Sequence, residues 1–285
     1  MYYNLSLLFT YFFLYAIIGW SCEVVYCSIP QKKFINRGFL NGPYCPIYGV
    51  GAIIIVMFLA PFIGFAPILF LMGVLITSTL EYVTSWGMEK LFHAKWWDYS
   101  AHKFNINGRI CLLNSILFGV MSLVLMYGIH PFVQSIIQSF SSFWLIVIAT
   151  SAGVFFIGDV IESTRETLDL NKKLGSVYEA TTELKNSLKE KGINTAHDLI
   201  AKVVDLKDGR LADAKDSAHT VVMNLTNRIQ ENKRFSNYTH RRILNAFPNM
   251  AHRDHQESLE VYKALLVKSK KKLKSDDFDT ISDGQ

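Results

Sequence analysis

Three long stretches of the chain contain no Asp, Glu, Lys or Arg. They cover residues 1–22, 38–80 and 110–158. A helix that crosses a membrane needs about 20 predominantly apolar residues, so the first stretch can supply one crossing and each of the others a pair. Turn-forming residues divide the two longer stretches, at Pro61, Gly64 and Pro67 and at His130-Pro131. The pattern predicts membrane spans near residues 4–27, 45–62, 66–90, 110–129 and 143–162.

The polarity of the chain changes after the last predicted span. Residues 1–162 contain 13 charged side chains, whereas residues 163–285 contain 40. Soluble domains carry charge on about 25% of their residues throughout. The first part of the chain lies far below that proportion and the second part lies above it, which excludes a single soluble domain. A membrane domain at 1–162 followed by a water-soluble tail fits the distribution.

Basic side chains are confined to alternate connections between the predicted spans. The connections after the first and third spans hold all of those in the membrane domain: Lys32, Lys33, Arg37, Lys90, Lys95, Lys103 and Arg109. Cytoplasmic loops of membrane proteins are enriched in Lys and Arg. We therefore expect an all-α integral membrane protein with about five transmembrane helices, followed by a cytoplasmic amphipathic-helical tail. Its N-terminus should lie outside the cell, and its basic loops inside.

The two helical hairpins that precede the fifth span resemble each other. They cover residues 4–62 and 66–129, and the first helix of each carries a Glu in its inner half, Glu23 in one and Glu81 in the other. Each loop then ends in Asn-Gly-x-x-Cys. The pattern indicates two parallel repeats with the fifth span outside them. Because Asn-Gly is a common turn pair, chance recurrence is the alternative.

Carboxylates fall at similar depth in spans one, three and five. A charged side chain at the centre of a bilayer costs around 3 kcal/mol, so such residues normally face a partner or a cavity. We predict a polar pocket that opens to the cytoplasm and is lined by Glu23, Glu81, Asn41, Asn107, Arg109 and Asp159. The alternative is that Glu23 and Asp159 lie at the membrane interface and stay hydrated.

The loop at 90–109 is rich in aromatic and titratable side chains. Trp and Tyr concentrate at membrane interfaces, so one interpretation is an interfacial amphipathic segment. The other interpretation is a docking surface for a partner protein. The candidate docking residues on the two basic loops are Arg37, His93, Trp96, Trp97 and Asp98.

Common catalytic and metal-binding motifs do not occur in the sequence. The segment Lys173-Leu174-Gly175-Ser176 lacks the upstream glycine and the Gly-Lys pair of a phosphate-binding loop. No Gly-x-Ser-x-Gly elbow is present, and the Glu, His and Cys residues lack zinc-site spacing. We therefore expect no catalytic residues, no metal site and no cofactor. A separate protein would have to supply any energy from ATP.

The tail at 163–274 shows helical periodicity, which predicts three or four amphipathic helices. A coiled-coil-like stripe runs through Leu174, Val177, Thr181, Leu184 and Leu188. A basic cluster at 268–274 favours contact with anionic lipid rather than nucleic acid, because no nucleic-acid motif accompanies it. Residues 275–285 are acidic and polar, which is typical of disorder.

Several longer motifs carry a family resemblance. They are Asn36-Arg37-Gly38-Phe39-Leu40-Asn41-Gly42-Pro43, Leu80-Glu81-Tyr82, Trp96-Trp97-Asp98-Tyr99-Ser100, Asn107-Gly108-Arg109-Ile110-Cys111 and, in the tail, Ala246-Phe247-Pro248-Asn249. Over about residues 10–165 the chain resembles the bacterial family named putative ABC transporter permease, type IV or CmpB-like. The resemblance implies a multi-pass protein of the bacterial plasma membrane that works with a separate ABC-type ATPase subunit.

Three functions follow from these observations. The leading hypothesis is a permease-like transport subunit for an unknown solute, which could also form a homodimer. The second is a membrane-anchored scaffold or regulator that acts through its helical tail. The third is an intramembrane enzyme acting on a lipid-linked substrate, with Glu23 or Glu81 as acid or base.

Overall fold

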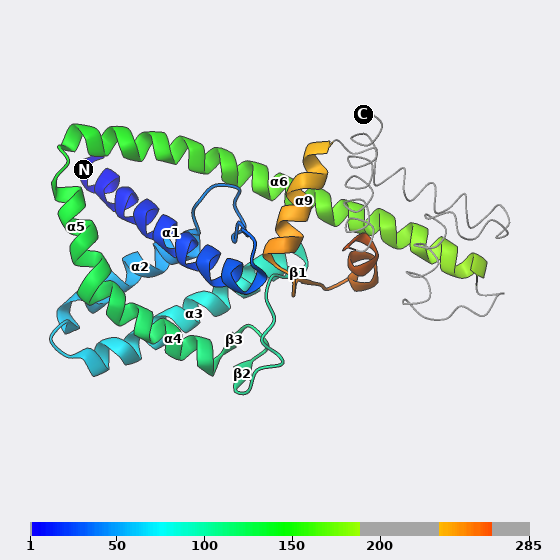
Figure 1. Cartoon of the computed structure of the whole chain (residues 1–285), viewed down its shortest axis with the longest axis horizontal. Helices are drawn as coiled ribbons and strands as arrows, with labels where there is room; N and C mark the ends of the chain where they lie inside the picture. Colours follow the sequence, from blue (N-terminus) through cyan, green and yellow to red (C-terminus); the bar gives the residue numbers. More distant parts are fainter. Residues whose placement is uncertain (1, 189–233, 264–285) are drawn as a thin grey trace, which may run out of the picture. The chain divides into compact units, whose positions relative to one another are not determined.

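The structure is a computed structural model, which describes residues 2–188 and 234–263 (Figure 1). The helices of the membrane part are α1 (Tyr2–Gln31), α2 (Pro46–Leu59), α3 (Ala66–Phe92), α4 (Leu112–Val124), α5 (His130–Gln138) and α6 (Ser142–Leu188). The tail contributes α9 (Arg234–Ala246) and helical residues 256–263. Four two-residue strands complete the described part, β1 (Ala94–Lys95), β2 (Asn105–Ile106), β3 (Ile110–Cys111) and β4 (Ala251–His252).

The chain divides into two compact units. Unit 1 comprises Met1–Arg165 and Asn245–Met250, and unit 2 comprises Glu166–Leu244 and Ala251–Gln285. Unit 1 therefore contains the apolar helices together with a short piece of the tail. In the described part of unit 2, Leu170 and Leu174 of α6 are fully buried, as is Ile243 of α9.

Four helices of the described residues are long and apolar enough to cross a membrane: Leu5–Gln31, Ala66–Phe92, Leu112–Gln138 and Ser142–Glu179. This confirms a membrane protein built from transmembrane helices. The second predicted span is also an apolar helix, because α2 continues into the 3-10 helix η1 (Ala60–Phe62). Its 17 residues extend for about 26 Å, slightly less than a bilayer core of about 30 Å. The crossing by this helix stays a prediction.

The fourth predicted span does not end at residue 129. The chain passes from α4 through the π-helical segment η2 (Leu125–Ile129) directly into α5. The predicted break at His130-Pro131 was wrong because Pro131 lies in the first turn of α5. Proline is tolerated there, and the π-helical turn before it changes the hydrogen-bond register. His130 also ties α5 to α1, since its Nδ1 lies 2.6 Å from the Tyr15 hydroxyl.

The helix that contains the fifth predicted span does not end at residue 162. It continues unbroken as α6 to Leu188. The predicted domain boundary at 163 thus falls inside a helix. Of the coiled-coil-like stripe, Leu174 and Val177 are buried, and the side chains of the remaining positions lie outside the described residues. The predicted helices between 189 and 233, the basic cluster at 268–274 and the acidic end at 275–285 also lie outside them.

Consecutive helices of unit 1 pack in alternating directions. The Cys45 amide at the start of α2 donates to the carbonyl of Ala16 in α1, 2.9 Å away. The Ser78 hydroxyl of α3 donates to Ser115 of α4 at 2.8 Å. Helix α6 lies along α1, where Phe156 packs edge-on against Phe12 with ring centroids 5.5 Å apart (Figure 1). A buried apolar cluster joins these helices, including Tyr15, Leu59, Leu69, Met126 and Leu145.

A glycine allows α1 and α2 to approach closely. A Cβ atom on Gly49 would lie 2.6 Å from the carbonyl oxygen of Phe12 and 2.7 Å from its ring. The backbone oxygen cannot move away without shifting α1. The pairing of the first two helices therefore depends on the absence of a side chain at this position.

We expect Gly49→Ala to destabilise the protein by about 1–3 kcal/mol, because the added methyl group overpacks the α1–α2 contact. The measurement is the thermal unfolding midpoint of the full chain in detergent. Gly87→Ala is the matched control, since nothing lies within 4 Å of a Cβ at that helical position. Equal midpoints for the two variants would contradict this account of the contact.

Candidate functional site

The loop between α1 and α2 folds back onto the end of α1. Asn36 is central to it, because its Oδ1 accepts a hydrogen bond from the Trp20 indole at 2.7 Å. The Asn36 amide nitrogen donates to the carbonyl of Asn41 at 2.9 Å. These bonds fix the segment that carries Arg37 and Asn41, both of which the sequence places in functional positions.

Glu23 of α1 lies between a tyrosine and an arginine. Its Oε1 accepts a hydrogen bond from the Tyr48 hydroxyl at 2.5 Å, and its Oε2 lies 3.6 Å from Nε of Arg37. Tyr48 can reach Glu23 because a Cβ on Gly19 would lie only 2.3 Å from the Tyr48 Cβ. The Gly-Trp-x-x-Glu motif at 19–23 thus holds the carboxylate and leaves room for the phenol that binds it.

Glu81 of α3 is the most deeply buried of the predicted acidic residues, with 6% of its surface exposed. Its Oε1 accepts a hydrogen bond from the Tyr99 hydroxyl at 3.1 Å. Its Oε2 is buried and has no hydrogen-bond partner in the described part of the chain. Burial raises the pKa of Tyr99 well above its usual range, and the nearby charges of Glu81 and Glu23 raise it further. Both carboxylates therefore act electrostatically on the Tyr99 phenol, and Glu81 also binds it.

Asp159 of α6 has a different environment. It accepts hydrogen bonds from the amides of Asn41 (3.0 Å) and Gly42 (2.7 Å). It also accepts from the hydroxyls of Tyr44 (2.7 Å) and Ser163 (3.0 Å). The pKa of Tyr44 is raised by burial and by Asp159, so the phenol remains a donor. These contacts anchor the loop before α2 to helix α6.

Arg109 and Asn107 form a third group, which includes Tyr82 and Glu89 of α3. Arg109 Nη2 lies 2.5 Å from Glu89 Oε2, and its guanidinium carbon lies 5.4 Å from the centre of the Tyr82 ring. The Asn107 amide donates to the Tyr82 hydroxyl at 2.9 Å. The acidic partner of Arg109 is therefore Glu89 in this arrangement.

Two of the predicted docking residues contact a segment of the tail within unit 1. The Arg37 guanidinium donates to the carbonyl of Ala246 and lies over the Phe247 ring, 4.9 Å from its centre. Phe247 also packs edge-on against Trp96, with centroids 4.9 Å apart. Trp96 is only 2% exposed. It cannot offer a surface to another protein in this conformation.

The other docking candidates shape the loop at 93–111. His93 adopts a left-handed conformation (φ 55°) directly after α3. The Trp97 indole donates to the carbonyl of Arg109 at 3.0 Å. Asp98 accepts hydrogen bonds from the amide and the hydroxyl of Ser100, and these lower its pKa. These contacts are all internal to unit 1.

The predicted pocket residues thus fall into three neighbouring groups. Glu23 and Glu81 each bind a tyrosine and both act electrostatically on Tyr99, Asn41 joins Asp159, and Asn107 and Arg109 share Tyr82. Sequence reasoning missed Tyr48, Tyr99 and Glu89 as partners. Tyr82 and Glu89 could have been linked, because residues seven apart share one face of a helix.

We expect Asp159→Asn to destabilise the protein by about 2–4 kcal/mol. The side-chain nitrogen of the new asparagine is a donor. It cannot accept the hydrogen bonds that Asp159 Oδ2 accepts from Gly42 and Tyr44, so buried polar groups are left unpaired. Thermal unfolding of the full chain in detergent measures the effect. Glu162→Gln is the control, because it removes a charge from the same helix without touching these contacts. An equal shift in both variants would show that charge alone matters.

Comparison with known proteins shows the family to which the apolar part of the chain belongs. The model of one protein family, described as "Putative ABC-transporter type IV", matches residues 10–164, which is more than half of the chain. No curated protein and no solved structure matches. The matched region contains α1 to α5, the two loops and the Asp159 end of the apolar part of α6. The chain therefore belongs to the family of type IV putative ABC transporters.

Proposed function

We propose that this chain is the permease-like membrane subunit of a transporter in the bacterial plasma membrane, and that a separately encoded ATPase drives it. The observation that carries the proposal is the buried carboxylate of Glu81, one oxygen of which has no hydrogen-bond partner in the described part of the chain. A carboxylate at membrane depth is costly when its oxygens lack donors, and such residues generally mark substrate or ion pathways. Because the charge of Glu23 also acts on the Tyr99 phenol, the site suits a cationic or hydrogen-bond-donating group.

The packing directions support five crossings for this subunit. Helix α2 runs antiparallel to α1, and it also packs against α3, where a Cβ on Gly51 would lie 3.1 Å from the Leu80 side chain. Helix α6 runs parallel to α1, because Phe9 lies near Gly153 and Phe12 near Phe156. Alternating crossings put the basic loops and the tail on one side, which we assign to the cytoplasm.

We assign the ATPase contact to the exposed tips of the two basic loops. Phe34 is 72% exposed and Phe104 is 78% exposed, although both are large and apolar. Each follows a lysine, Lys33 or Lys103. A partner that covered both rings would bury apolar surface beside basic side chains. They replace the buried Trp96 as the candidate docking residues.

A membrane-anchored scaffold or regulator is the second candidate. The packing of Phe247 on Trp96 and under Arg37 favours it, because part of the tail is then built into the membrane unit. Partners of a scaffold would be soluble proteins without ATPase activity, held by the tail. Deletion of 170–285 would release them, whereas an ATPase bound to the loops would remain.

We expect the chain to co-purify from native membranes with a nucleotide-hydrolysing subunit identified by mass spectrometry. Phe34→Ser and Phe104→Ser should each lower its recovery at least about tenfold, as loss of a central apolar contact does. Phe65→Ser is the matched control, because Phe65 is 55% exposed on the other set of loops. Recovery of the wild-type chain without any ATPase would contradict the proposal.

Glu81→Gln should abolish solute-coupled ATP hydrolysis by the purified complex while leaving the unfolding midpoint unchanged or higher. The Glu81 charge is buried and has one hydrogen bond, so its removal relieves the free-energy cost of burying it. Functional sites commonly carry such a cost in stability. Glu89→Gln, which breaks the ion pair with Arg109, is the comparison and should lower the midpoint. A destabilised Glu81→Gln variant would instead assign Glu81 a structural role.

A further inference from the structure

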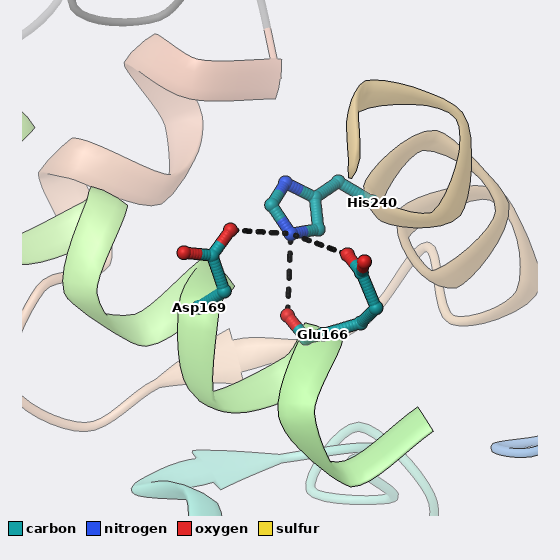
Figure 2. A group of neighbouring side chains, drawn as sticks. All are labelled: Glu166, Asp169 and His240. Carbon is teal, nitrogen blue, oxygen red and sulfur yellow. Dashed lines mark hydrogen bonds and ion pairs between the residues drawn. The ribbon is translucent and has the colours of Figure 1, made fainter. Parts of the chain in front are cut away.

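Three potential metal ligands lie together in unit 2. Helix α6 supplies Glu166 and Asp169, one turn apart, and α9 supplies His240 (Figure 2). The His240 Nε2 lies 3.6 Å from Glu166 Oε2 and 3.7 Å from Asp169 Oδ2. The ligand atoms of all three residues lie within 4.8 Å of one another.

These separations suit an enclosed ion better than direct hydrogen bonds. Distances of 3.6 and 3.7 Å exceed those of N–H···O hydrogen bonds. Two ligands that each lie about 2.1 Å from an ion and enclose an angle of about 110–120° are about 3.4–3.6 Å apart. Nε2 also donates a hydrogen bond to the backbone carbonyl oxygen of Glu166, 3.2 Å away, so binding of an ion at Nε2 would move the ring proton to Nδ1 (Figure 2).

The imidazole of His240 is held in a state that can bind a metal. Its side chain is fully buried, and its Nδ1 lies 2.9 Å from the Tyr262 hydroxyl. Metal-binding histidines generally make such a bond with the nitrogen that does not ligate, which fixes the ring. With Nδ1 directed at the Tyr262 hydroxyl, Nε2 is the ring nitrogen that faces Glu166 and Asp169.

The local charge also favours a divalent cation. Glu166 and Asp169 supply two negative charges, and Lys173 offsets one of them through its Nζ, 2.9 Å from Asp169 Oδ2. A net negative charge remains beside the buried imidazole. One nitrogen and several oxygen donors suit first-row divalent ions, whereas thiolate-rich sites select softer ions.

We propose that Glu166, Asp169 and His240 form a binding site for a first-row divalent cation of the Mn²⁺ or Zn²⁺ type. The ion joins α6 to α9, with Tyr262 as a positioning residue. The site is independent of the transport proposal, because none of its residues belongs to unit 1. From the sequence we expected no metal site, and the proposed ion in the tail is an exception to that expectation.

The test uses the full chain in detergent, stripped with EDTA and then incubated separately with MnCl₂ and with ZnCl₂. After desalting, elemental analysis should find about one retained ion per chain, and the unfolding midpoint should rise. His240→Gln and Glu166→Gln should each weaken retention at least about tenfold. Glu260→Gln is the matched control, an exposed acid of the same unit outside the cluster, and should bind as the wild type does.

Tyr262→Phe is a second test, which remains informative even if the His240→Gln and Glu166→Gln variants do not fold. It keeps the buried ring and removes only the hydroxyl next to Nδ1, so affinity should fall about tenfold while the unliganded protein remains folded. Failure of the stripped wild type to retain either ion would overturn the proposal. Equal retention by the wild type, His240→Gln and Tyr262→Phe would overturn it as well, since the ion would then be bound elsewhere.

Discussion

The carboxylate of Asp159 is the interaction on which the loop end of unit 1 depends. Inside a membrane protein, a backbone that leaves a helix needs donors and acceptors from its own chain. The segment before α2 has such a break, and Asp159 satisfies the amides of Asn41 and Gly42 there. Because hydrogen bonds to a charged group contribute about 1.5–3 kcal/mol each, one side chain can fix the loop. The position of the segment that leads into α2 follows from it.

Three carboxylates of unit 1, those of Asp159, Glu23 and Glu81, differ in how far their charges are satisfied. Asp159 has donors on both oxygens, and Glu23 has a phenol on one oxygen and Arg37 near the other. Glu81 has a single phenol. A fully satisfied charge stabilises a structure, whereas a partly satisfied one lowers its stability. The gradient therefore sets Asp159, which holds the loop before α2, apart from Glu81, to which we assign the proposed role in transport.

The sequence predicted the apolar helices well, because charge-free runs of this length have few other stable states. It predicted their ends poorly at Pro131, where a π-helical turn accommodates the ring, and after residue 162, where the helix simply continues. The grouping of the candidate residues could not be predicted, because it depends on loop geometry, as the Arg109–Glu89 pair shows. The cluster around His240 was out of reach, because Glu166 precedes it by 74 residues.

The aromatic residues of the basic loops show why composition alone cannot locate a docking surface. Trp96 and Phe34 have similar hydrophobicity and lie in loops of similar charge, yet one is buried and the other is 72% exposed. The difference comes from Phe39, Phe92 and Phe247, which enclose Trp96 and leave nothing apolar to solvent. A side chain that is already packed gains little hydrophobic free energy from a partner, whereas an exposed one can gain about 25 cal/mol per Å² buried. In the proposed contact with an ATPase, the loop tips would therefore supply the hydrophobic driving force, whereas Trp96 stabilises the loop that carries Phe104.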